Sequence, residues 1–172
     1  MSDGVGCVID NGVMFLKLRG ELRHDNAGPL EALIEHCFEV EHCQIHGAFI
    51  DLNDVSFLDS TAIGLLAAIA RALQSRNLPP PSVFSTSAEI NQLLRSLRLD
   101  RAFVLVEKAT DGRQLSAVPQ LATVADGDSE QCSAAAILRA HETLIELNEG
   151  NRVAFQPVVD LLRQQIRVDQ GG

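Results

Sequence analysis

The sequence predicts an α/β fold in which a mixed β-sheet is packed with helices and followed by a C-terminal helical hairpin. Two observations carry this prediction. Segments of strand length alternate with segments whose apolar residues recur every three to four positions, up to about residue 108. Beyond a polar stretch, two more helical patterns follow each other with only a short break at 149–151.

An antiparallel pair of strands is expected at the start of the chain. Asn11-Gly12 lies between the apolar segments 6–9 and 13–19. An Asn-Gly pair in this setting is the strongest short hairpin signal, because both positions tolerate positive φ. The sequence therefore predicts two strands joined by a tight turn.

An amphipathic helix follows the hairpin. Its apolar residues share one stripe: Leu30, Leu33, Ile34, Cys37 and Phe38. Pro29 suits the first helical position, and Asp25 or Asn26 lies close to the helix start.

Three strands and two helices complete the first unit. Strands are expected at 48–52, 82–86 and 103–106. The helix between the first two ends near Asn77, and the next one starts with a capping box formed by Thr86 and Glu89. Repeated strand-helix-strand order implies parallel pairing through right-handed crossovers. We expect this domain to span residues 1–108.

The remainder divides into a linker, 109–131, and a helical hairpin, 132–172. Ser133 is the expected cap of the first helix and Asn151 of the second. Pro157 conflicts with the second pattern, so that helix either kinks there or begins only near Gln156. The apolar stripes need a partner surface. The hairpin could serve dimerisation, cover the domain or bind a second partner, and the sequence does not choose.

Charge argues against two classes of partner. The chain has 23 acidic and 14 basic residues and a formal net charge of −9. This balance repels phosphate backbones and anionic membrane surfaces, so we expect neither nucleic acid nor membrane as a partner. The apolar runs are too short to span a bilayer and Met1-Ser2-Asp3 lacks a basic start. We expect a cytoplasmic protein.

Metal and cofactor sites are not expected. The cluster His36-Cys37, His42-Cys43 and His46 matches no compact zinc pattern, and the four cysteines show no C-x-x-C pair. Asp51, Asp54 and Asp59 are better explained as solvated loop carboxylates and a helix cap than as ligands of a divalent ion.

The stretch Asp59-Ser60-Thr61 stands at the expected start of a helix. Either Asp59 or Ser60 is a good N-cap, which would explain both without any function. The same place also accepts a phosphate well, because a helix N-terminus presents free N–H groups and partial positive charge. Gly64 is not explained by capping, since glycine in a helix costs about 1 kcal/mol relative to alanine. Close approach of another backbone or of a partner protein would explain it.

These residues resemble a known family. Asp59-Ser60-Thr61-Ala62-Ile63-Gly64, preceded by 49–52 and 55–58, is similar to the signature of the STAS domain, named for sulfate transporters and anti-sigma-factor antagonists. The likeness spans roughly residues 5 to 107 and includes Gly20-Glu21-Leu22. It implies a small mixed sheet with helices, in agreement with the order derived above. The helical tail lies outside it.

The resemblance implies a bacterial signal-transduction protein that regulates transcription by partner switching. Ser60 would be phosphorylated by an anti-sigma factor with serine kinase activity and dephosphorylated by a serine phosphatase. The unphosphorylated form would bind the anti-sigma factor through Asp59, Ser60, Thr61, Gly64, Glu21, Arg23 and Asp25. Arg23 departs from the acidic residue often found after Gly-Glu-Leu, and Asp25 follows two positions later. This change is expected to alter partner choice.

Catalysis is not expected. Ser60 has no Gly-x-Ser-x-Gly surroundings and no histidine that the sequence places beside it, and the chain has no Walker loop. The alternative to the switch is a binding module without one. In that case Ser60 is only a cap, and the domain binds a nucleotide, another signalling protein or a second copy of itself.

Overall fold

The computed structural model describes residues 4–39, 44–107, 122–123 and 131–171. It begins with the predicted hairpin, in which β1 (Gly4–Asp10) and β2 (Val13–Leu22) pair antiparallel. Asn11 and Gly12 have φ values of 49° and 78°, which confirms the Asn-Gly turn.

The described strands form one mixed sheet in the order β5-β4-β3-β2-β1-β6. The strands β3 (Gly47–Leu58), β4 (Ser82–Phe84) and β5 (Val104–Val106) run parallel to β2, as predicted. The two-residue strand β6 (Ala122–Thr123) pairs antiparallel with β1 and lies within the predicted linker 109–131, of which the described residues are 122–123 and 131. The predicted α/β mixed sheet is confirmed.

Strand β3 is longer than the predicted 48–52, because its pairing with β2 continues to Leu58 through two register irregularities. Asp51 and Asp54 interrupt the apolar sequence of this strand, and a carboxylate oxygen of each lies 3.0 Å from Nζ of Lys17 on β2. Burial opposes the charge on Lys17, but hydrogen bonds to the two carboxylates outweigh it and raise the pKa of the ammonium group. Paired charges thus keep a polar stretch inside the sheet.

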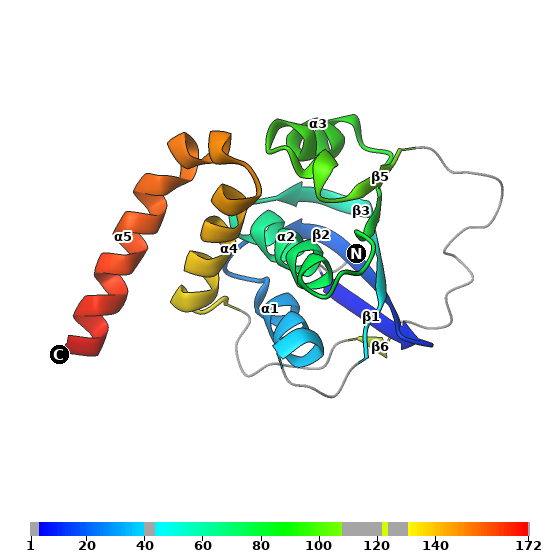
Figure 1. Ribbon diagram of the computed structural model, residues 1–172, viewed down its shortest axis with the longest axis horizontal. Coiled ribbons are helices and arrows are strands. Elements are labelled where there is room, and N and C mark those ends of the chain that lie inside the picture. The colour runs from blue at the N-terminus through cyan, green and yellow to red at the C-terminus, as the bar shows by residue number, and fades with distance from the viewer. Residues whose placement is uncertain (1–3, 40–43, 108–121, 124–130, 172) are drawn as a thin grey trace.

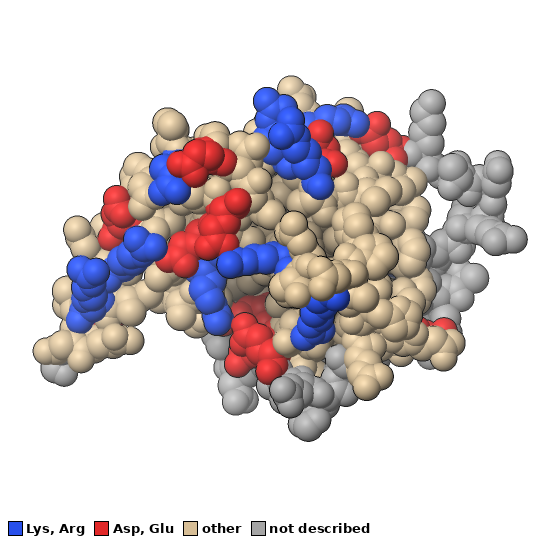
Figure 2. All heavy atoms as spheres, viewed as in Figure 1, with Lys and Arg blue, Asp and Glu red and all other residues tan. Residues whose placement is uncertain are grey.

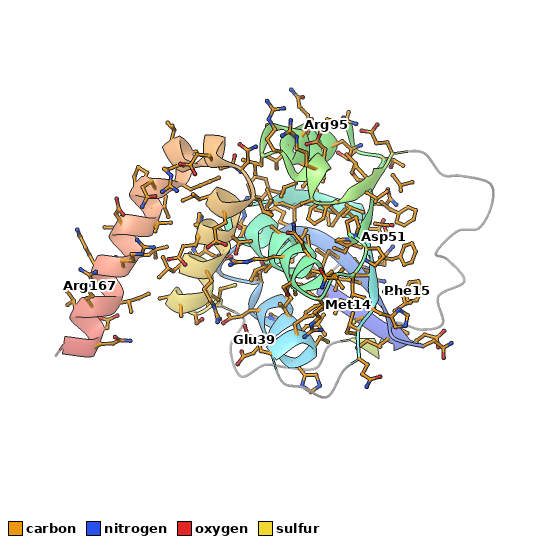
Figure 3. All side chains as sticks on the ribbon, in the orientation of Figure 1. Met14, Phe15, Glu39, Asp51, Arg95 and Arg167 are labelled. Carbon is orange, nitrogen blue, oxygen red and sulfur yellow. The ribbon has the colours of Figure 1, made fainter. Side chains whose placement is uncertain are left out.

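Helices lie against one face of this sheet (Figure 1): α1 (Gly28–Ile34), which runs on into the π-helical turn Glu35–Glu39, and α2 (Ser60–Ser75). Met14 and Phe15 point to opposite sides of β2 (Figure 3), as neighbouring strand residues must. Met14 is fully buried, whereas Phe15 is half-buried and stacks on Phe49 with ring centroids 5.4 Å apart.

The start of α3 (Ala88–Ser96) differs from the prediction. The cap is Ser87, whose Oγ accepts the Ile90 N–H at 3.3 Å. Thr86 instead donates its backbone N–H to Oδ1 of Asn53 at 2.9 Å. The predicted capping box of Thr86 with Glu89 is therefore wrong, because the side chain of Asn53 on β3 takes the backbone N–H of Thr86.

Two C-terminal helices are present as predicted: α4 (Ala134–Leu147) and α5 (Arg152–Gly171), joined through a 3-10 turn, Glu149–Asn151. Ser133 caps α4, since its Oγ accepts the Ala136 N–H at 3.1 Å.

The second helix of this pair begins differently from the prediction. Asn151 does not cap α5, because its side-chain Nδ2 donates to the carbonyl oxygens of Leu97 at 3.0 Å and Leu144 at 2.9 Å. The helix starts at Arg152 and not near Gln156, so Pro157 lies inside it. The buried amide of Asn151 therefore ties the hairpin to the end of α3.

Helix α4 lies between α2 and α5, and α5 forms the outer edge of the molecule (Figure 1). Lys, Arg, Asp and Glu side chains are interspersed over α3, α4 and α5 (Figure 2). Among the described residues, every helix falls short of the length and apolarity needed to cross a bilayer.

Candidate functional site

The start of α2 is held by a single carboxylate. Oδ1 of Asp59 accepts the Ala62 N–H at 2.8 Å, which makes Asp59 the N-cap. Oδ2 accepts the backbone N–H of His24 at 2.8 Å. The sequence left Asp59 and Ser60 as equal candidates for the cap. The structure assigns the cap to Asp59 and uses the same side chain to hold the loop that follows β2.

Ser60, the first residue of α2, is half-buried and has a partner far away in the chain. Its Oγ lies 2.8 Å from Nε2 of His141 on α4. Nδ1 of the same ring lies 2.7 Å from the carbonyl oxygen of Ile137, which can only accept, so Nδ1 carries a proton. In the neutral imidazole, Nε2 then accepts the hydroxyl proton of Ser60.

His141 is itself enclosed. Its side chain is buried, and the ring meets Phe155 of α5 edge-on with centroids 5.5 Å apart. His141 lies 81 positions after Ser60, and the sequence did not predict this pairing. Its only signal is a polar residue in the stripe of α4 that also carries Ile137, Leu144 and Ile145.

Helix α4 approaches α2 closely at Gly64. A Cβ built on Gly64 would lie 2.5 Å from the carbonyl oxygen of Ala140 and 2.6 Å from its Cβ, distances that real Cβ atoms do not reach. The close approach that the sequence left open is therefore made by the chain's own helix. Gly64 and Thr61 are both buried, so neither faces solvent in this arrangement.

The loop after β2 brings the other predicted site residues to the same place. Glu21 and Asp25 are exposed and Arg23 is half-buried. The guanidinium of Arg23 lies 3.3 Å from Oε2 of Glu21 and 4.0 Å from the ring centroid of Phe57, an exposed aromatic that the sequence analysis also missed. The Asp59 N–H donates to the Leu22 carbonyl at 3.0 Å, which joins the loop to the start of α2.

Asn26 fixes the shape of this loop. Its Oδ1 accepts the Arg23 N–H and its Nδ2 donates to the Glu21 carbonyl, both at 2.7 Å. The amide is thus engaged in the loop. The N-cap of α1 is Ala27, which has no capping side-chain hydrogen bond.

The C-terminal hairpin begins on this loop. The Cys132 N–H donates to the His24 carbonyl at 2.7 Å, and Ser133 donates through its N–H and Oγ to the Glu31 carboxylate at 3.0 and 2.7 Å. Burial, followed by the charges of Glu31 and Asp59, raises the pKa of the Cys132 thiol to about 12. The hairpin is therefore anchored within the candidate site.

The acidic residues weighed as metal ligands have other partners. Asp51 and Asp54 pair with Lys17, and Asp59 caps α2. The described ranges contain no group of three or more side chains that could hold a metal ion. In the Cys/His cluster Cys37 is buried, and His42 and Cys43 lie outside the described residues.

Comparisons with known proteins bear on this site. The family model described as STAS domain matches residues 7–111, more than half of the chain. Comparison with curated proteins finds no significant match.

Solved structures of similar fold include an anti-sigma factor antagonist from Mycobacterium paratuberculosis, with 24% identity, a TM-score of 0.49, and coverage of 69% of this chain and 96% of that one. The anti-sigma factor antagonist SpoIIAA in its unphosphorylated form is 17% identical with a TM-score of 0.46, over 55% of this chain and 82% of that one. The Bacillus cell fate determinant SpoIIAA in the phosphorylated form is 17% identical with a TM-score of 0.50, over 68% and 99%. This last likeness shows the fold.

Proposed function

Because the chain belongs to the STAS domain family, we propose that it is an anti-sigma factor antagonist of a partner-switching pathway. In this proposal the unphosphorylated protein binds an anti-sigma factor that is also a serine kinase. Phosphorylation of Ser60 releases that partner, and a serine phosphatase restores binding. The antagonist SpoIIAA, whose fold the chain shares, is known in an unphosphorylated and a phosphorylated form.

One observation carries the proposal: the hydroxyl of Ser60 is not needed to cap α2. Asp59 accepts the N–H of Ala62, the third residue of the helix, so the hydroxyl of Ser60 is not needed as a capping acceptor in α2. Its hydrogen bond goes to His141 on a different helix. Ser60 is therefore not the N-cap that the non-switching alternative assumed.

Phosphorylation of Ser60 suits the N-terminus of α2. Oγ of Ser60 would attack the γ-phosphorus of ATP held by the kinase, the bond from that phosphorus to the bridging oxygen would break, and ADP would leave. The hydroxyl proton passes to a base of the kinase. The product carries about −1.5 to −2 charges at the N-terminus of a 16-residue helix, where free N–H groups and the helix dipole favour an anion.

The proposed partner surface joins two elements. Its rim is formed by Glu21 near the end of β2 and by the half-buried Arg23 and exposed Asp25 in the loop that follows, and Ser60 begins the neighbouring helix α2. With a net charge of −9 the protein is expected to meet a basic partner surface. A phosphate placed on Ser60 would have to lose its hydration at the point of contact, which weakens docking of the partner.

Self-association through the C-terminal helices is a separate proposal. It is favoured by exposed apolar side chains on α5, which are Val153, Val158, Leu161 and Val168. Sedimentation velocity of the wild type and of Leu161→Glu tests it: a dimer that the substitution dissociates supports self-association, and a monomeric wild type contradicts it.

The proposed switch is tested with the anti-sigma serine kinases encoded in the same genome, each purified and incubated with ATP and this protein. Intact-mass measurement and peptide mapping should find one phosphate, on Ser60. Ser60→Ala should abolish its incorporation, and Thr61→Ala should leave it unchanged. Phosphate that persists in Ser60→Ala would place the acceptor elsewhere.

A further inference from the structure

We propose that the C-terminal hairpin is an autoinhibitory cover. Helix α4 occupies the surface beside Ser60, so a kinase or an anti-sigma factor reaches that surface only after α4 and α5 move away. This inference rests on the proposed function of Ser60 and adds a level of regulation to it.

The hydroxyl of Ser60 is hydrogen-bonded to His141 of the hairpin. The Oγ atom that would receive a phosphoryl group lies 2.8 Å from Nε2 of a buried imidazole. A phosphorus atom and three oxygens attached to Oγ would need the space that this ring fills. Phosphorylated Ser60 and docked α4 therefore exclude each other, and the phosphate can be added only in the open arrangement.

Gly64 of α2 lies against Ala140 of α4. The backbone of Ala140 lies where any partner approaching this glycine would have to be, and a Cβ there would come within 2.5 Å of the Ala140 carbonyl oxygen. Thr61, one turn before Gly64 on α2, is 3% exposed. In the covered arrangement neither of these predicted partner-binding residues is open to a partner.

The hairpin is attached to the domain by a small share of the core and by polar contacts. Among its described residues, Cys132 and Leu144 belong to the buried part of the main apolar cluster, and Ile137, Leu147 and Phe155 pack against that cluster while only partly buried. Several other ties are exposed polar contacts: Ser133 with Glu31, Arg139 with Glu39, and Glu146 with Arg71. Exposed ion pairs contribute little to stability. Among the described residues, every other buried member of the cluster lies outside the hairpin, so we expect the hairpin to leave without unfolding the domain.

The consequence is a shift in the apparent affinity for a partner. If only a fraction of molecules is open, the apparent dissociation constant equals the intrinsic one divided by that fraction. Any change that weakens docking of α4 raises the open fraction and strengthens binding. Phosphorylation would hold the site open but charged, and the cover could return only after dephosphorylation.

The test uses two Ala-to-Leu substitutions on the same helix. Ala140→Leu adds bulk at the contact with Gly64, whereas Ala135→Leu adds the same bulk on the exposed face of α4. Hydrogen exchange of α4 reports docking without any partner. The affinity for the anti-sigma factor and the initial rate of phosphorylation on Ser60 report access to the site. We expect Ala140→Leu to speed exchange in α4 and to raise affinity and rate about tenfold or more. Ala135→Leu should change neither.

His141→Phe is a second variant, which keeps a ring against Phe155 but loses the hydrogen bond to Ser60. It should move all three readouts in the same direction as Ala140→Leu, and it carries the test if circular dichroism shows that Ala140→Leu does not fold. Faster exchange in α4 without a gain in affinity or rate overturns the cover while the proposed function stands. If variants with undocked α4 neither bind an anti-sigma factor nor accept phosphate, the proposed function is wrong, and the autoinhibition proposal fails with it.

Discussion

The hydroxyl oxygen of Ser60 and Nε2 of His141 lie 2.8 Å apart, although 81 positions separate the two residues in the chain. This hydrogen bond joins the first turn of α2 to the C-terminal hairpin. The residue proposed to be phosphorylated is thus also a residue that holds α4 in place. We expect the chemical state of Ser60 and the position of α4 to be coupled in both directions.

Substitutions at Ser60 should separate charge from the loss of a hydroxyl. Ser60→Asp is expected to weaken binding of the anti-sigma factor by about 30-fold or more, because a carboxylate at position 60 would lose its hydration at the interface. Ser60→Ala should leave binding unchanged or strengthen it, because it removes only the bond to His141 that favours the covered arrangement. Isothermal titration calorimetry measures both. Equal affinities would reject the switch.

Capping of α2 depends on Asp59. Asp59→Ala loses the bonds to the N–H groups of Ala62 and His24, so we expect the free energy of unfolding to fall by about 1–2 kcal/mol. Asp59→Asn keeps an acceptor for the cap and should lose less. Urea denaturation measures the free energy of unfolding of both variants, and a value for Asp59→Ala equal to that of the wild type would mean that the wrong residue has been assigned as the cap.

The contact between α2 and α4 makes Gly64 sensitive to one methyl group. Alanine would improve helix propensity by about 1 kcal/mol, but its Cβ would meet the backbone of Ala140. We expect Gly64→Ala to destabilise docking by about 1–3 kcal/mol, seen as faster hydrogen exchange in α4. Gly171→Ala, at a helical glycine with no neighbour within 4 Å of the added Cβ, is the matched control and should be neutral.

Stability should fall at alkaline pH because of Cys132. Burial, with Glu31 and Asp59, raises the pKa of its thiol from 9.0 in the unfolded chain to about 12. The folded state therefore holds this proton more tightly than the unfolded state. The resulting stabilisation is complete below pH 9.0 and is lost as pH rises towards 12. Urea denaturation of Cys132→Ala across this interval should show a smaller loss than the wild type, and parallel curves would contradict the assignment.

Local sequence patterns predicted most of the fold. The Asn11-Gly12 turn, the crossover order and the helical hairpin follow from periodicity and turn chemistry, which act over a few residues. The errors arose where distant groups compete for the same backbone. Thr86 bonds to Asn53 and not to its own helix, and Asn151 reaches Leu97 across the fold. Neither pairing has a sequence spacing that could be recognised in advance.

The candidate site was predicted in part for the same reason. The block from Asp59 to Gly64 does lie beside the segment that carries Glu21, Arg23 and Asp25, since Asp59 bonds to the Leu22 carbonyl and to the His24 N–H. The cover over them could not be predicted, because a helix with an apolar stripe can pack on several surfaces. Gly64 was the one residue in the sequence that indicated a close contact over the start of α2. The sequence did not indicate that the backbone at Ala140 makes this contact.

The most direct measurement of the central claim is the affinity of the anti-sigma factor for this protein before and after stoichiometric phosphorylation of Ser60, determined by isothermal titration calorimetry on one preparation. The account predicts that phosphorylation weakens binding by about 30-fold or more and that phosphatase treatment restores it. An affinity that is the same in both states would contradict it.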